Sequence, residues 1–541
     1  MIKESLFRSD ILSNIYHNFI FFLSYNDMYT YAGISFFILL FVWGTTFFSS
    51  PNCYRCFVPQ ENFKFKKSIF SNKLAIVGLF LSVVLYICNM FAMEQSVFST
   101  FDSMTIDFID SMKHGIKSVF GEWRFTPLSG IDYNLIHGIS NNYLIINIYI
   151  LIKQLLCIYL IYQFLSFIPV TKRLVAITLI NVVPAIFVVN NIIYIEQSII
   201  IFVLLSLMSA EKYQKNNNKI FLLSFLIFMN LAIYAKETVI LFYAGLGIYL
   251  LLEDVFDNKI TINSFFTPLK LFKTIPMEWI MFWSMFIWFT LWFLSSPIEE
   301  NRYLTTHLYS LLDVISAHKV ELLLNLTAII VALYNIIIGK CRKIFLFCEG
   351  TLIGSTIITV FIVFYLKSGS YSDYMLSYYL YLPAIFSTIY IFYALNQKMI
   401  LSIIVGIVLC ISAWQNYMII DNQQGKSRRD IAEYIISNAK YKDMSVYLYS
   451  TDIIDYKWWK TMAWSSALKY ANPNLRLKFK TNLDIYKYYL REEDKFYEKQ
   501  LGYPTLGDHI LVNKKSEKDY HPDANQKLVY ENKFYQMYYV E

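Results

Sequence analysis

Long apolar runs constrain this chain more than any other feature. A bilayer crossing needs about 20 predominantly apolar residues, and a scan at that length finds about twelve apolar segments between residues 30 and 419. Only 16% of the 541 residues are charged, whereas a soluble chain carries about 25%. The sequence therefore predicts an all-α polytopic membrane protein with about 12 spanning helices. The segments are 30–49, 74–93, 143–168, 174–190, 193–209, 220–235, 238–252, 276–294, 320–338, 344–366, 378–395 and 399–419.

Some of these segments are shorter than a bilayer requires. The pairs 174–190 with 193–209 and 220–235 with 238–252 are either tight hairpins or helices that extend into their flanks. The apolar stretch within residues 1–29 is too short to span and is typical of an interfacial helix.

Positive charges predict the orientation of the segments. One alternating set of loops carries 17 Lys and Arg residues and the other set carries seven. Because cytoplasmic loops are enriched in Lys and Arg, the richer set is expected in the cytoplasm. Residues 95–142, 236–237, 295–319, 367–377 and the tail after about 420 are then expected outside. The net charge of +7 is spread between apolar runs and forms no basic patch, which argues against nucleic-acid binding.

The composition changes near Asp421, where a tail rich in Lys, Asp, Glu, Asn and Tyr begins. Three domains are therefore expected: an N-terminal interfacial segment over 1–29, a transmembrane catalytic domain over 30–420, and a small extracytoplasmic α/β domain over 421–541. In the tail, period-2 and helical patterns predict strands and helices. The predicted strands are 444–450, 509–513 and 528–540, and the predicted helices are 429–439 and 456–470.

The outer loop 95–142 carries the densest set of acids. Asp102, Asp107 and Asp110 lie where apolar residues recur at helical spacing, which predicts an amphipathic helix along the membrane surface. Asp107 and Asp110 are three residues apart and so share one face. The alternative interpretation is a charged, solvated loop face.

Four further ionisable residues stand inside apolar runs or at their predicted outer ends. They are Lys153, Glu196, Lys236 and Glu237. An ionisable side chain at membrane depth is costly and indicates a functional site by default. For Lys153 the structural alternatives are snorkelling to the interface or an ion pair with Glu196. Lys236 lies in a turn too short to be a solvated loop, so its ammonium is expected at the outer membrane edge, at the depth of a lipid phosphate. The structural alternative is a turn anchor that faces lipid headgroups and pairs with Glu237 or another acid.

Several short motifs follow one another along the chain. They are Asp107, Gly121-Glu122-Trp123 and Pro127 in the first outer loop, Pro184 followed by Glu196, Ala235-Lys236-Glu237-Thr238, and the stretch 379–383. Their order and the predicted topology resemble the GT-C class of integral-membrane glycosyltransferases, which use lipid-linked sugar donors, over most of the chain. Two positions depart from the class: Phe108 stands where a second acid often follows Asp107, and Tyr378 stands where an Arg usually precedes the late Tyr. Among members of the class, the chain looks most like bacterial enzymes that decorate O-antigen or other surface glycans.

This resemblance implies an inverting enzyme of the bacterial cytoplasmic (inner) membrane, with its active site facing the periplasm. It implies transfer of a hexose such as glucose from polyprenyl phosphate to a surface-polysaccharide, O-antigen-like acceptor. A carboxylate must take the acceptor proton; Asp107 is expected as this base, with Asp102 and Asp110 as alternates. The remaining candidates bind the donor phosphate or sugar, and they are Glu122, Trp123, Arg124, Lys153, Glu196, Lys236 and Glu237.

Other functions remain open at this point. A surface-polysaccharide polymerase or ligase would use similar lipid-linked sugars, and a lipid-linked-glycan flippase or transporter would be a non-enzyme alternative. The sequence contains no glycine-rich nucleotide loop and no His and Asp cluster with metal spacing. No cofactor is therefore expected, while a divalent ion held by carboxylates is left open.

Overall fold

The computed structural model describes most of the chain after residue 142 and a few positions before it. The predictions for 1–127 and for 456–470 concern residues outside this part, apart from Phe80. The described part is mostly helical, with a small sheet near the C-terminus, as the fold class predicted. It comprises residues 143–191, 195–256, 274–295, 318–337, 346–367, 379–395, 398–423, 425–439, 443–449, 476–480, 503–514 and 520–541. The single positions 80, 128, 130, 132, 133, 135, 136 and 315 are also described.

The apolar segments after residue 142 form helices, as predicted. Among the described helices, three are long and apolar enough to cross a membrane, over Ile148–Phe167, Thr238–Val255 and Met399–Asn416. The larger number of spans stays a prediction. The helices are α8 (Tyr143–Phe164), the short η2 (Leu165–Phe167), α9 (Val170–Val182), α10 (Pro184–Asn191), α11 (Glu196–Asn216), α12 (Lys219–Ala235), α13 (Thr238–Phe256), α15 (Pro276–Ser295), α17 (Lys319–Ile337), α18 (Leu346–Lys367), α19 (Tyr381–Ala394) and α20 (Lys398–Gln423).

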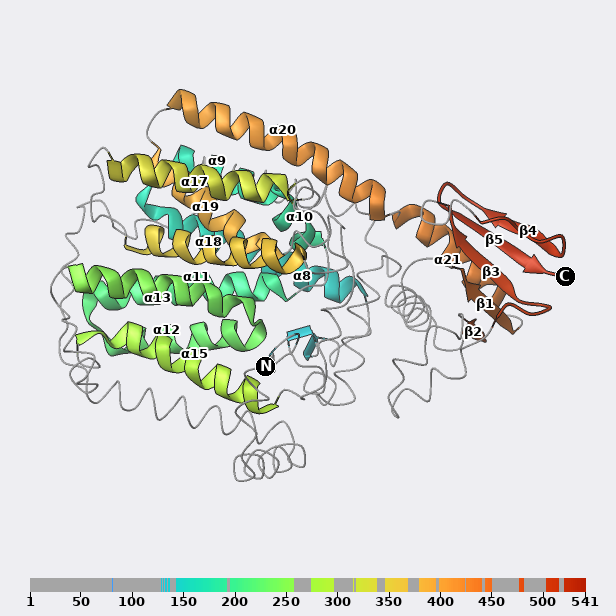
Figure 1. The fold of residues 1–541 in the computed structure, drawn as a ribbon, viewed down its shortest axis with the longest axis horizontal. Helices are drawn as coiled ribbons and strands as arrows, with labels where there is room; N and C mark the ends of the chain where they lie inside the picture. The colour runs from blue at the N-terminus through green and yellow to red at the C-terminus, as the bar shows by residue number, and fades with distance from the viewer. Residues whose placement is uncertain are drawn as a thin grey trace. The chain divides into compact units, whose positions relative to one another are not determined.

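The helices pack around one large apolar core that includes Phe164, Phe242 and Phe386. Helix α13 lies along α18 (Figure 1), and the two backbones approach closely where Gly245 meets Gly354. A Cβ atom built on Gly245 would lie 2.5 Å from the Cα atom of Gly354. Glycine has no Cβ atom, so the two backbones can come this close.

The predicted segment 174–190 is broken into α9 and α10 at Val183. Pro184 has no N–H to continue the α9 hydrogen-bond ladder, and it becomes the first residue of α10. The Asn416 side chain donates to the Val182 carbonyl at 2.8 Å, and the Glu321 carboxylate accepts from the Ala185 N–H at 2.8 Å. Side chains from α20 and α17 thus satisfy backbone groups that the break leaves free.

The Cα positions group into two compact units, of which the larger is the helical bundle and the second contains residues 417–541. In the second unit a five-stranded sheet has the order β2-β1-β3-β5-β4. β1 pairs in parallel with β2 and β3, while β5 is antiparallel to both β3 and β4. The elements are α21 (Gly425–Ala439), β1 (Met444–Leu448), β2 (Leu477–Lys480), β3 (His509–Asn513), β4 (Gln526–Glu531) and β5 (Tyr535–Val540).

The sheet buries alternate side chains against α21, the helix beside it in Figure 1. Val446 of β1 and Met537 of β5 pack with Ile431 and Ile435 of α21 in one core cluster. This period-2 burial follows the predicted strand pattern, and the predicted helix 429–439 and strands 444–450 and 509–513 are confirmed.

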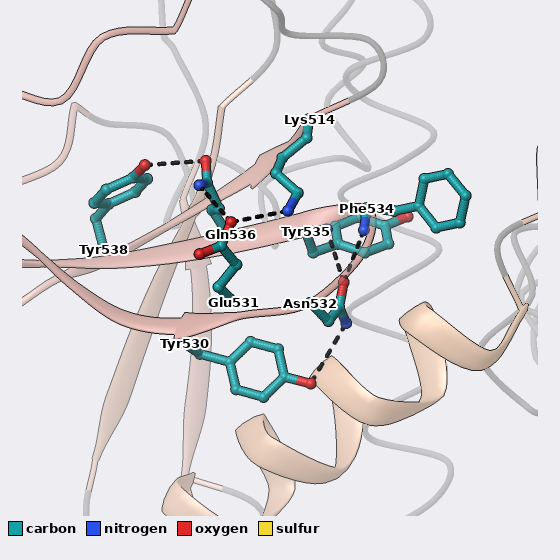
Figure 2. Close-up of polar contacts among 8 residues, drawn as sticks. All are labelled: Lys514, Tyr530, Glu531, Asn532, Phe534, Tyr535, Gln536 and Tyr538. Carbon is teal, nitrogen blue, oxygen red and sulfur yellow. Dashed lines mark hydrogen bonds and ion pairs between the residues drawn. The ribbon is translucent and has the colours of Figure 1, made fainter.

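The predicted single strand 528–540 is wrong, because residues 532–534 turn between β4 and β5. Asn532 causes the reversal: its side-chain oxygen accepts from the Phe534 and Tyr535 N–H groups at 3.0 and 2.8 Å (Figure 2). Glu531 accepts from Gln536 across the same hairpin at 3.0 Å, and from Lys514, the residue after β3, at 2.9 Å (Figure 2). A short polar side chain that bonds to following backbone groups is a turn signal that the Tyr-rich pattern concealed.

Candidate functional site

An ion pair between Lys153 and Asp132 forms the first half of the site. Lys153 lies in the middle of α8, and its side chain is only 5% exposed. Its Nζ is 3.0 Å from Asp132 Oδ2. The Tyr149 hydroxyl donates to the same oxygen at 3.0 Å, as does Ser198 Oγ at 2.7 Å. The ammonium also lies 3.8 Å from the centroid of the Tyr133 ring, which adds a cation–π attraction.

The Asp132 carboxyl has a pKa below its ordinary value. Burial alone raises this pKa, but the Lys153 charge and the hydrogen bonds from Ser198, Lys153 and Tyr149 outweigh that effect. Asp132 is therefore ionised at neutral pH. Its side chain is 26% exposed, in contrast with its buried partner.

An ion pair between Glu196 and Lys236 forms the second half. Glu196 is the first residue of α11, where a carboxylate complements the helix dipole. Lys236 ends α12 in the tight turn before α13, and its ammonium pairs with Glu196 Oε1. The same ammonium lies 4.5 Å from the centroid of the Tyr379 ring, just before α19. Both charged side chains are buried.

The two ion pairs belong to one cluster. Glu196 and Ser198 share the first turn of α11, and this turn contacts both lysines: Lys153 Nζ donates to Ser198 Oγ at 3.3 Å, and Lys236 pairs with Glu196. Glu196 also attracts Lys153 electrostatically. The Leu128 N–H donates to the Tyr234 carbonyl at 3.1 Å, which ties the segment before Asp132 to the end of α12. Residues that are remote in sequence thus gather at one end of the bundle.

Two buried oxygens in this cluster have no hydrogen-bond partner among the described residues. They are Glu196 Oε2 and the Tyr381 hydroxyl. Tyr381 lies within electrostatic reach of Glu196 and of the half-buried Glu237. Unsatisfied buried polar atoms are uncommon in folded proteins, and functional sites are one place where they persist.

The structure brings together three of the predicted site residues, Lys153, Glu196 and Lys236, and places Glu237 beside them in the turn. Lys153 pairs with Asp132 and not with Glu196, whose partner is Lys236. Lys236 is buried within the bundle and pairs with Glu196, as its structural alternative allows, while its contact with a lipid phosphate stays a prediction. The other predicted site residues lie outside the described part, and they are Asp102, Asp107, Asp110, Glu122, Trp123 and Arg124.

Sequence reasoning missed the roles of Asp132, Ser198 and Tyr149. Asp132 was recognisable only as one of several acids of the outer loop, because its partner is 21 residues away. Ser198 carries no charge that would mark it in an apolar run. Tyr149 stands four residues before Lys153, a spacing that puts both side chains on one helix face and is the one signal that points to it.

The cluster can bind polar groups in several ways. Asp132 offers a partly exposed carboxylate, and the lysines provide positive charge that can stabilise a developing anion. Within the described ranges, no group of three or more His, Cys, Asp or Glu side chains is arranged to hold a metal ion.

Comparison with known proteins identifies no family for this chain. No protein-family model matches this sequence, and no curated protein is significantly similar to it.

Proposed function

We propose that this chain is a multi-pass glycosyltransferase of the GT-C class that transfers a hexose from polyprenyl phosphate to a surface-polysaccharide acceptor. The proposal includes about 12 spanning helices, residence in a bacterial cytoplasmic membrane, and an active site that faces the periplasm. It rests on the order of motifs in the sequence and on the geometry of the cluster.

One observation carries the proposal: a cluster of two lysines, the buried Glu196 and the partly exposed Asp132 joins the end of the first outer loop to three helix ends in an apolar bundle. Asp132 belongs to that loop, while Glu196, Lys236 and Tyr379 stand at helix ends far along the chain. Charges this costly at a bundle end are characteristic of a substrate site. Lys153 and Lys236 of this cluster are the residues expected from the sequence to contact the donor phosphate, and the neighbouring Glu237 is expected to bind sugar hydroxyls or orient those cations.

In the proposed step, the acceptor hydroxyl attacks C1 of the donor sugar. A new C1–O bond forms while the bond from C1 to the phosphate oxygen breaks, with inversion at C1. The acceptor proton passes to a carboxylate, for which Asp107 is the first candidate, and polyprenyl phosphate leaves with the bonding electron pair. Positive side chains such as Lys236 and Arg124 stabilise the charge that develops on the phosphate.

The test is release of free polyprenyl phosphate from polyprenyl-phosphate-glucose by membranes that contain the full chain. Asp107→Asn should leave expression intact and lower turnover by about 10²–10⁴-fold, because the amide cannot accept the proton. Asp102→Asn and Asp110→Asn are the matched controls on the same loop. Full activity of Asp107→Asn with loss in either control would move the base, whereas full activity of all three variants would contradict the proposed enzyme class.

A further inference from the structure

The hydrogen bonds to Asp132 fall on one oxygen of its carboxylate. Lys153 Nζ, Tyr149 Oη and Ser198 Oγ all donate to Oδ2, at 3.0, 3.0 and 2.7 Å. Among the described residues, Oδ1 accepts no hydrogen bond. A carboxylate has about four acceptor positions, so this arrangement fixes the side chain through one oxygen, while no described residue bonds to the other.

Exposure follows the same asymmetry. The Lys153 side chain is almost completely buried, while the Asp132 side chain is 26% exposed. The ammonium therefore lies on the inner side of the pair and the carboxylate on the outer side. A lysine held in this way, with its charge directed at Asp132 and Tyr133, is poorly available for a donor phosphate.

The chemistry of Oδ1 favours a hydroxyl ligand. The group is an ionised acceptor whose charge is stabilised by its anchors, and hydrogen bonds to ionised acceptors are stronger than those between neutral groups. The same stabilisation makes it a weaker base than an ordinary carboxylate, which suits binding better than proton abstraction. An anionic phosphate would be repelled by it.

We propose that Asp132 is a substrate-contacting residue whose Oδ1 accepts a hydrogen bond from a sugar hydroxyl, with Lys153, Ser198 and Tyr149 as positioning residues that hold Oδ2. This inference rests on the proposed glycosyltransferase function. It assigns Lys153 a role in orienting Asp132 in place of the phosphate contact expected from the sequence.

The experiment combines a variant with altered donors. Purified full-length protein in lipid vesicles is assayed with polyprenyl-phosphate-glucose and with its 2-, 3-, 4- and 6-deoxyglucose analogues. Loss of a hydrogen bond to a charged group should lower kcat/KM about 10- to 100-fold. The parent protein should show this loss with one deoxy donor. Asp132→Asn should show a similar loss with the glucose donor and no further loss with that same deoxy donor.

A second arm distinguishes a hydroxyl of the acceptor from one of the donor. Octyl glucoside and its monodeoxy analogues serve as acceptors, and transfer to them is compared with donor hydrolysis by water. If Asp132→Asn lowers transfer to octyl glucoside, causes no further loss with one deoxy acceptor and leaves donor hydrolysis unchanged, the hydroxyl that Asp132 contacts belongs to the acceptor. If the loss from Asp132→Asn and the loss from each deoxy substitution multiply for every donor and every acceptor, the proposed contact is overturned.

Two further variants test the proposal without breaking the ion pair, in case Asp132→Asn fails to fold. Asp132→Asn leaves the buried Lys153 without its charge partner, whereas Ser198→Ala and Tyr149→Phe keep the ion pair and each remove one anchor of Oδ2. Both should reduce the penalty for the sensitive deoxy sugar, and an unchanged penalty in both would overturn the positioning role. Glu211→Gln breaks the ion pair with Lys215 near the other end of α11, and its sugar preference should match the parent.

The two hypotheses fail in different ways. A folded parent protein that releases lipid phosphate from none of the donors would overturn the proposed function and this inference with it. A parent that turns over glucose donor, together with an Asp132→Asn variant that retains full kcat/KM and unchanged sugar preference, would overturn this inference alone.

Discussion

At the scale of single residues, the Glu196–Lys236 ion pair combines burial with opposite charge. Removing one charge from a buried pair leaves the other uncompensated, which costs about 3–5 kcal/mol, whereas replacing both with apolar residues is often neutral. Lys236→Met should therefore lower the thermal unfolding midpoint of the purified protein, and Glu196→Leu with Lys236→Met should restore most of it.

Turnover separates a functional role from this structural one. If Lys236 stabilises the departing phosphate, the restored double variant should remain at least about 10²-fold slower than the parent at saturating donor. If the double variant turns over nearly as fast as the parent, Lys236 has a structural role and does not stabilise the departing phosphate.

Asp508 predicts a pH dependence for the sheet unit. Burial alone raises the pKa of its carboxyl, but hydrogen bonds from Lys480, the Thr505 N–H and Thr505 Oγ1 outweigh that effect and hold the pKa below its ordinary value of 3.8. A depressed folded-state pKa adds stability that is complete above 3.8 and is lost as the pH falls through the folded value. Amide-exchange protection of β3, corrected for intrinsic rates, should fall in that range, and Asp508→Asn should be less protected at pH 6 with a flatter pH profile. If the protection of β3 in Asp508→Asn declines with pH as it does in the parent, the Asp508 carboxylate is not the origin of the pH dependence.

At the scale of elements, the α13–α18 contact depends on glycine. A Cβ atom on Gly354 would collide with the Phe242 carbonyl oxygen, a backbone atom that cannot move without its helix. Gly354→Ala should destabilise the protein by about 1–3 kcal/mol through overpacking, measured as a lower unfolding midpoint. Gly406→Ala in α20 is the matched control, because a Cβ atom there meets nothing within 4 Å. That substitution should be neutral or stabilising by up to about 1 kcal/mol.

Helix positions were predictable because apolar length is a local property of the sequence. The break at Val183 was not, since an apolar run with one proline fits both a kinked and a divided helix. The same limit applies to the site: Lys153, Glu196 and Lys236 stood out as charges in apolar runs, but their partners depend on packing between helices. Nothing local indicates that Lys153 meets Asp132 while Glu196 meets Lys236.

At the scale of the whole molecule, the distribution of Lys and Arg predicts that the turn between α11 and α12 and the sheet unit face opposite sides of the membrane. In a cysteine-free background, Asn216→Cys should react with a membrane-impermeant maleimide only after the membrane is opened. Lys533→Cys, on the β4–β5 turn, should react in intact spheroplasts. Both positions are exposed. Labelling of both from the same side would invalidate the predicted orientation and the periplasmic active site.

The divided helix α9–α10 also has a consequence for biosynthesis. Its free N–H and carbonyl groups are satisfied by Glu321 and Asn416, which are separated from their partners by 136 and 234 residues of chain. When α9 and α10 leave the ribosome, neither partner has been synthesised, and buried backbone groups without a hydrogen-bond partner are costly. This pair of helices therefore reaches its final geometry only after translation passes residue 416, so the maturation of this end of the bundle is timed by the synthesis of α20.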